Sequence, residues 1–285
     1  MRIKTNVAGI NSTRNQGINQ MGMNKSLEKL SSGYKIVRAG DNAAGLALSE
    51  GMRRQIYGLD QAMRNTNDGI GLVNTGEGAL TEVHSMLQRM NTLATESANG
   101  TYNDTARESI TEEISQLLSE IDRIGASTDF NGIPLFDSSK GAITGKPPVQ
   151  GTVPGAEIQL QIGCSEEETL AAKRFRLGQD GLAISDIKVD SVGNANAAMP
   201  KIEDAIQAVS LIRNEYGSIY THLEHTHRNL SVNKENLQAS ESYIRDTDVA
   251  EEYTTYTKNN IMLQAAQSIM TQANAIPQGV LNMLR

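Results

Sequence analysis

Residues 80–90 read Leu-Thr-Glu-Val-His-Ser-Met-Leu-Gln-Arg-Met. Within this stretch, apolar side chains recur in steps of three, four and three residues, at Leu80, Val83, Leu87 and Met90. Such steps place the side chains along one stripe of an α-helix and are typical of bundles and coiled coils. No proline occurs in residues 46–99, so about 54 residues at 1.5 Å each predict a rod roughly 80 Å long. A rod of that length needs partner helices.

The same steps return in two further segments, which predict the second and third helices of a bundle. The stripes comprise Ile110, Ile114, Leu117, Ile121 and Ile124, and later Ile202, Ile206, Val209, Tyr216, Ile219, Leu223, Leu230, Leu237 and Ile244. Four glycines, Gly69, Gly71, Gly76 and Gly78, interrupt the first rod. Because glycine weakens a helix interior by about 1 kcal/mol relative to alanine, we expect a bend or a close helix contact there.

The pattern changes between about residues 130 and 192, where Gly, Pro and Ser separate short runs. Glu157-Ile-Gln-Leu-Gln-Ile162 alternates with period two, which predicts a β-hairpin. Lys140 to Gly155 contains three prolines and several glycines, which predicts an exposed loop. The expected fold class is mainly α: an elongated helical bundle or coiled coil with a small β-hairpin region, in which the N- and C-terminal helices pair.

Apolar stripes also occupy both ends of the chain. We predict a polymerisation seam made of Ile3, Val7, Ile10, Leu27 and Leu30 at the start and of Met262, Ile269, Ile276, Val280 and Met283 at the end. Chain termini usually fray unless something holds them. The seams are therefore expected to be buried against each other or against neighbouring copies of the chain.

Composition excludes several classes of protein. The formal net charge of −7 and the pI near 5.2 argue against nucleic-acid binding, which needs clustered Lys and Arg. No stretch approaches 18 consecutive apolar residues, so no membrane association is expected, and hydropathy alone indicates a cytoplasmic protein. Cys164 is the only cysteine, which excludes an intrachain disulfide and a thiolate metal cage.

Candidate chemistry is sparse. His222 and His225 share a helix face at i, i+3 beside His227, but a zinc site needs a third ligand and supporting hydrogen bonds, so a solvated helix face is the favoured interpretation. Gly69-Ile-Gly71 lacks the third glycine of the dinucleotide fingerprint and lies within a helical stripe. The sequence shows no Ser-His-Asp or Cys-His arrangement of the kind used in nucleophilic catalysis. The sequence therefore predicts no enzyme, no metal and no cofactor.

Several motifs resemble those of bacterial flagellins. Thr5–Asn11, Leu27–Ile36 and Asp41–Leu46 are similar to the flagellin amino-terminal signature, and Ile244–Glu252 and Gln272–Leu281 are similar to its terminal helix. The resemblance covers roughly residues 1–136 and 199–285. About sixty residues lie between these parts, so the chain resembles a short form without the large variable outer domains.

The resemblance implies a structural subunit of the flagellar filament that self-assembles through its terminal helices to give motility. Residues 1–40 and 245–285 would form a terminal coiled-coil polymerisation domain. Residues 41–244 would form a core domain with the hairpin and loop region at about 130–192. The implied location is the bacterial flagellum, reached by secretion through the flagellar type III apparatus without a cleaved signal peptide. This expectation replaces the cytoplasmic one.

The resemblance also implies partners. These are other flagellin subunits in a homopolymer, a flagellar export chaperone, hook-associated and cap proteins, and host toll-like receptor 5. Residues 87–94 and 113–123 look like the flagellin helices that this receptor recognises, and the positions carried over are Gln88, Arg89, Leu93 and Glu113. We expect an exposed patch in which charges flank an exposed Leu93. The alternative, that these residues contact the next subunit, is compatible with it.

Two other classes share features of this sequence. A hook-filament junction protein would share the terminal helices, although Asp41-Asn-Ala-Ala-Gly45 and Val280–Arg285 favour flagellin itself. A cytoplasmic coiled-coil signalling module would share the long heptads but would not need apolar chain ends. A discrete dimer on sedimentation would support the signalling module, whereas growth of long polymers from short seeds would support flagellin.

Overall fold

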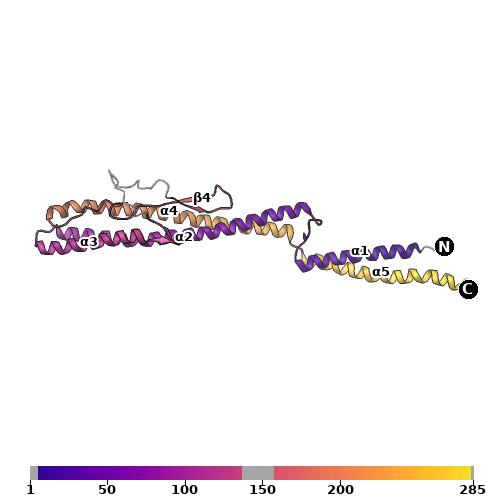
Figure 1. The fold of residues 1–285 in the computed structure, drawn as a ribbon. Helices are drawn as coiled ribbons and strands as arrows, with labels where there is room; N and C mark the ends of the chain where they lie inside the picture. The colour runs from indigo at the N-terminus through magenta and orange to yellow at the C-terminus, as the bar shows by residue number, and fades with distance from the viewer. Residues whose placement is uncertain (1–5, 137–156, 284–285) are drawn as a thin grey trace. The chain divides into compact units, whose positions relative to one another are not determined.

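The computed structural model describes residues 6–136 and 157–283. These residues form five helices and two small antiparallel sheets, which confirms the mainly α fold class (Figure 1). The elements are α1 (Val7–Ser32), α2 (Ala43–Ser97), α3 (Asp104–Ser127), β1 (Asp129–Phe130), β2 (Ile133–Pro134), β3 (Glu157–Gln161), β4 (Thr169–Lys173), α4 (Val192–Arg245) and α5 (Val249–Met283). The exposed loop predicted for residues 140–155 lies outside the described residues.

The chain divides into two compact units. Residues 58–233 form one unit, and the residues up to Tyr57 together with those from Lys234 onward form the other. The long helices α2 and α4 contribute to both units. The predicted division into a core domain and a polymerisation domain assigns roles to these parts, and those roles stay a prediction.

The larger unit is built around the predicted helical stripes. In α2, the side chains of Leu80, Val83, Leu87 and Met90 are fully buried. They share one hydrophobic core with residues of α3 and α4, among them Ile114, Ile121, Ile202, Val209 and Leu223. The three-four spacing therefore identified the inner faces of the three-helix core. Asn103 begins α3, because its side chain accepts a hydrogen bond from the Ala106 backbone N–H at 2.9 Å.

Two of the four glycines in α2 mark close contacts. A Cβ atom added at Gly76 would lie 2.6 Å from Cε1 of Tyr216, and one at Gly69 would lie 2.9 Å from Cδ1 of Leu160. Nothing lies within 4 Å of the equivalent position at Gly78. The helix continues through all four, so the close contact predicted for this region is confirmed at Gly69 and Gly76.

The predicted hairpin is present as β3 and β4, which pair antiparallel with Leu160 opposite Leu170. A second, shorter hairpin joins β1 to β2 through Asn131 and Gly132, whose φ angles of 52° and 77° lie in the left-handed region that Asn and Gly tolerate. Both hairpins belong to the larger unit.

In the other unit, α1 lies along α5 (Figure 1), so the predicted pairing of the terminal helices is confirmed. Asn6 caps the start of α1 by accepting the Gly9 N–H at 3.1 Å. The helix ends at Gly33, whose φ of 74° allows its N–H to return to the Lys29 carbonyl at 2.8 Å.

Candidate functional site

Small side chains line the contact between α1 and α5. Ser12 and Ser26 of α1 are 6% and 2% exposed, and Ala266 and Ala273 of α5 are also buried. A Cβ atom at Gly22 would lie 3.0 Å from the Asn259 side chain. The two backbones therefore approach closely, as small residues permit.

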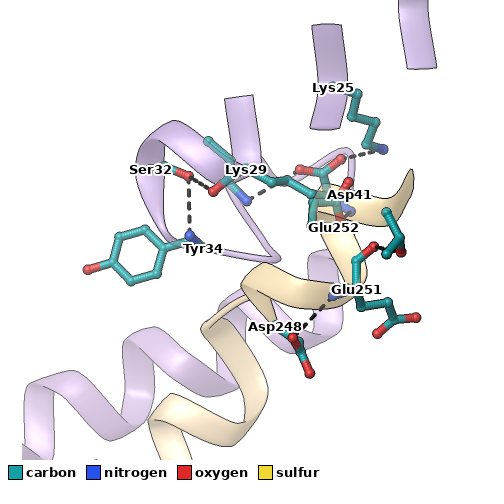
Figure 2. Close-up of polar contacts among 10 residues, drawn as sticks. Lys25, Lys29, Ser32, Tyr34, Asp41, Asp248, Glu251 and Glu252 are labelled. Atoms are coloured by element: carbon teal, nitrogen blue, oxygen red, sulfur yellow. Dashed lines mark hydrogen bonds and ion pairs between the residues drawn. The ribbon is translucent and has the colours of Figure 1, made fainter. Parts of the chain in front are cut away.

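Polar bonds cross this contact. Ser12 Oγ donates to the Ala266 carbonyl at 3.0 Å, deep in the interface. Lys29 Nζ donates to Glu252 Oε2 at 3.1 Å (Figure 2). A typical intramolecular hydrogen bond adds only about 0.5 to 1.5 kcal/mol net. The pair is therefore held by close packing and a few polar bonds and not by a thick apolar core.

Ten large apolar side chains among the described residues of this helix pair are exposed, whereas others, such as Leu30, Leu263 and Met270, are half-buried. Those recorded as exposed, each by 49% or more, are Val7, Ile10, Ile18, Met21 and Leu27 on α1 and Val249, Tyr253, Ile261, Met262 and Ile269 on α5. Large apolar side chains that a chain leaves exposed in number often mark an interaction site. The outer faces of α1 and α5 are therefore candidates for contact with another protein surface.

The predicted seam divides between these faces. Val7, Ile10, Leu27, Met262 and Ile269 are exposed in the single chain. Leu30 is half-buried. Ile3 and the side chains of Ile276, Val280 and Met283 lie outside what the structure describes. The five exposed seam residues do not meet between α1 and α5, because the alanines of α5 occupy that contact. A role for the seam in polymerisation stays a prediction.

Asp41 organises the segment that joins α1 to α2. Its Oδ2 accepts the backbone N–H groups of Val37 and Arg38 at 3.3 and 3.2 Å. Its Oδ1 lies 2.7 Å from Lys25 Nζ on α1 (Figure 2). The hydrogen bond from Lys25 and those from the two backbone N–H groups lower the pKa of Asp41 to about 2. The carboxylate therefore ties the connecting segment to α1.

The two connecting segments also bind each other. Gly33 accepts the Thr247 N–H at 2.9 Å, and the Lys35 N–H donates to the Arg245 carbonyl at 2.6 Å. The Arg245 guanidinium lies 4.6 Å from the ring centroid of Tyr34 and 2.7 Å from a carboxylate oxygen of Glu50. These contacts connect the end of α1, the start of α2 and the end of α4 within one unit.

The predicted receptor patch is only partly as expected. Arg89 on α2 is exposed and pairs with the half-buried Glu113 on α3, with Arg89 Nε 2.8 Å from Glu113 Oε1. Gln88 is also exposed, and its amide lies 3.0 Å from the His84 ring nitrogen. The expectation that Leu93 is exposed is wrong, because its side chain is 2% exposed and belongs to the core of the larger unit. It lies three residues after Met90 and continues the buried stripe.

Family models match both ends of the chain. The bacterial flagellin N-terminal helical region matches residues 3–141, and the bacterial flagellin C-terminal helical region matches residues 199–284. The chain is 42% identical to a flagellin of Halalkalibacterium halodurans over the full length of both chains. This chain belongs to the bacterial flagellins.

Further relatives agree with this assignment. The chain is 40% identical to a flagellin of Bacillus subtilis and 38% identical to a flagellar filament 31.3 kDa core protein of Treponema maltophilum, with both chains covered completely. As a flagellin, the chain is a structural subunit of the flagellar filament and not an enzyme. The signalling-module hypothesis is therefore wrong.

The remaining candidate groups of this flagellin contribute no assembled site. His222 and His225 are exposed on α4, and His227 is half-buried. Within residues 6–136 and 157–283, no group of three His, Cys, Asp or Glu side chains is placed to hold a metal ion. Cys164 is an exposed free thiol. None of the described helices has the length and apolar character that crossing a membrane requires.

Sequence reasoning missed the inner face of the flagellin's terminal pair. Ser12 and Ser26 carry no apolar signal, and Ala266 and Ala273 carry a weaker one than the isoleucines and methionines of the same helix. One available signal was the seven-residue spacing of the two alanines, which places them on one helix face. Sequence reasoning also assigned no role to Asp41, although the signature motif that begins with Asp41 was identified.

Proposed function

We propose that this flagellin polymerises by burying the outer faces of α1 and α5 against neighbouring copies, so that residues 1–40 and 245–285 act as the polymerisation domain and residues 41–244 as the core domain of a filament that gives motility. The observation that carries the proposal is the inverted distribution of side chains on the terminal pair. Its buried residues are small, such as Ser12, Ser26, Ala266 and Ala273, whereas ten of its described large apolar residues are exposed.

Burial of the exposed apolar side chains favours assembly. Val7, Ile10, Leu27, Met262 and Ile269 are each about half exposed. Since full burial of such a side chain contributes about 1.5 to 3 kcal/mol, burying their exposed parts would contribute roughly 4 to 8 kcal/mol per subunit. The translational and rotational freedom lost on association costs about 4 to 15 kcal/mol, so a subunit needs several such contacts. Repeated contacts along a filament add to the same total.

Seeded growth tests the proposal. Ile269→Ser should slow or abolish growth of filaments from short seeds, because it removes apolar area from the docking face. Leu211→Ser is the matched control, since Leu211 is 49% exposed but lies on α4 in the other unit. Circular dichroism melts of both variants check folding. Equal losses of growth in the two variants would show that the terminal pair is not the dominant assembly surface.

The exposed apolar side chains of α1 and α5 also bear on how the monomer is kept from aggregating and exported before assembly. Apolar helix faces left uncovered favour aggregation, so the monomer needs a partner until it reaches the filament tip. We expect a flagellar export chaperone to cover one of these helices, export through the flagellar type III apparatus, and contacts with hook-associated and cap proteins at the filament ends. Accumulation of the chain outside cells whose export apparatus is disabled would contradict this route.

We further propose that host toll-like receptor 5 docks on the exposed Gln88 and Arg89 and the half-buried Glu113 of the monomer, with Leu93 supporting the patch from below. What supports the proposal is the exposed Arg89–Glu113 ion pair, which joins two helices in one rigid surface. Arginine is enriched among the residues that dominate binding energy. The alternative is that these residues contact the next subunit of the filament. The two roles are compatible, because one surface can bind both partners at different times.

Binding to immobilised receptor ectodomain tests this second proposal. Arg89→Ala should cost about 1 to 4 kcal/mol of binding if Arg89 is an anchor. Arg228→Ala is the control, because the exposed Arg228 forms an ion pair with Glu224 on α4, in the same unit but outside both segments that resemble the recognised helices. Unchanged affinity of Arg89→Ala and Glu113→Gln would refute receptor docking and leave the filament proposal intact.

A further inference from the structure

A proline in α5 leaves one backbone carbonyl without its helical donor. Pro277 lies inside α5 and has no backbone N–H, so it cannot donate to the carbonyl of Ala273, four residues earlier. Ala273 is only 6% exposed. A buried carbonyl without a partner costs free energy, because water cannot replace the missing bond.

The missing donor comes from the opposite end of the chain. Asn6 Nδ2 donates to the Ala273 carbonyl at 2.9 Å, and the same group lies 3.3 Å from Asn274 Oδ1. Asn6 Oδ1 simultaneously accepts the Gly9 N–H as the cap of α1. One amide thus caps α1 and completes α5, where the start of one helix lies beside the end of the other (Figure 1).

The neighbouring glycine leaves room for this amide. A Cβ atom at Gly9 would lie 3.0 Å from Asn6 Nδ2 and 3.3 Å from Asn274 Oδ1. Glycine at this position therefore lets the amide lie between the two helices. An aspartate at position 6 would keep the cap but lose the donor, and a serine would keep the cap without the amide's second bond.

We propose that Asn6 is a positioning residue for filament assembly: its amide fixes the register of α1 against α5 by bonding the carbonyl that Pro277 leaves free. The inference rests on the proposed polymerisation through the outer faces of these helices. A slip of one residue moves a helix by 1.5 Å along its axis and turns its side chains by about 100°. The exposed apolar residues of α1 and α5 keep their positions relative to one another only while that register is held.

The test is a thermodynamic cycle on the critical concentration for seeded growth, using the full chain. Asn6→Ser should raise the critical concentration about tenfold, which corresponds to about 1.4 kcal/mol. Pro277→Ala restores a backbone donor for the Ala273 carbonyl. In that background Asn6→Ser should change the critical concentration less than twofold, because the amide is no longer needed. A merely structural loss at the helix start would persist in both backgrounds.

Asn15→Ser is the matched control, since Asn15 is an exposed asparagine of the same helix, and it should leave the critical concentration unchanged. An unchanged value for Asn6→Ser, or an equal loss with and without Pro277, overturns the role of Asn6. If Ile269→Ser impairs growth in the same assay, the filament proposal survives that result. If wild type and Asn15→Ser both fail to extend seeds, the filament proposal itself fails and the role of Asn6 fails with it.

Discussion

The two units of this flagellin use apolar residues in opposite ways. In the larger unit, leucine, isoleucine and methionine of α2, α3 and α4 are buried against one another, with Leu80, Leu87 and Met90 fully covered. In the terminal pair, serine and alanine are buried, and side chains such as Ile10 and Ile269 are exposed. One unit completes its core within the chain, whereas the other leaves large apolar side chains exposed, which we propose bind neighbouring subunits.

The difference shows that similar periodicity can serve folding or assembly. A stripe of apolar residues specifies which side of a helix is apolar but not what covers it. In α2 the covering helices follow in the same chain. In α1 and α5 the closest approach uses small residues, so the larger ones of the stripe remain outside. Stability of the monomer and stability of the filament should therefore respond to different substitutions.

The largest expected effect comes from removing the terminal pair. Deleting residues 1–35 and 244–285 should abolish seeded growth completely and leave a soluble helical monomer that melts cooperatively. The core of the larger unit draws on residues 72–223 and loses none of them. A seeding assay measures the loss of growth, and calorimetry of the same preparation measures whether the truncated monomer still melts cooperatively. A truncated chain that still extends seeds would remove the contrast between the units.

A substitution in each unit gives the next largest contrast. Leu93→Ala should destabilise the monomer by about 2 to 5 kcal/mol, because it leaves a cavity in the core. Ile269→Ala should change monomer stability by less than about 0.5 kcal/mol, since its side chain is exposed. Urea unfolding followed by circular dichroism measures both values. Similar losses of unfolding free energy in the two variants would mean that Ile269 is already buried in the monomer, as Leu93 is.

Two glycines of α2 sharpen the comparison within the larger unit. Gly76→Ala should destabilise by about 1 to 2 kcal/mol, because the clash with Tyr216 outweighs the gain in helix propensity. Gly78→Ala meets no atom within 4 Å and should stabilise the helix by up to about 1 kcal/mol. Thermal melts compare the two. Stabilisation by both would show that Tyr216 moves aside without cost.

The smallest effect concerns pH at Asp41. Its pKa is lowered from 3.8 to about 2 by the hydrogen bonds from Lys25 and the backbone, so its stabilising contribution is present above about pH 4 and is lost as the pH falls towards 2. The contribution should be small and weaker in high salt, because Lys25 is largely exposed. Carboxyl carbon NMR shifts report the titration directly. A Lys25→Gln variant should titrate nearer the ordinary value, and an unchanged midpoint would contradict the pairing.

Much of the larger unit was predictable because its helices bury their own stripes. The three-four steps located the inner faces of α2, α3 and α4, and period-two alternation located β3. The error at Leu93 arose where a family resemblance outweighed the periodicity, since Leu93 continues the stripe through Met90. Continuing the stripe would have placed it in the core.

The terminal pair was less predictable for a physical reason. Ala266 and Ile269 lie three residues apart on one apolar stripe, and only the distance between the helix axes decides which of them meets α1. The bond from Asn6 to Ala273 joins residues 267 positions apart. No local pattern specifies such a pairing. Pro277 did mark a carbonyl that needed a donor, but it could not indicate which side chain would provide one.

The hydrogen bond from Ser12 to the Ala266 carbonyl has a wider consequence. Helices in a lipid bilayer gain little by hiding apolar side chains from surroundings that are equally apolar, so they associate through small residues and through hydroxyl groups that bond backbone carbonyls. The pair α1 and α5 associates through the same kinds of groups, although no described helix of this chain could cross a membrane. If polymerisation proceeds as proposed, these internal contacts would persist when apolar side chains of neighbouring subunits cover the outer faces.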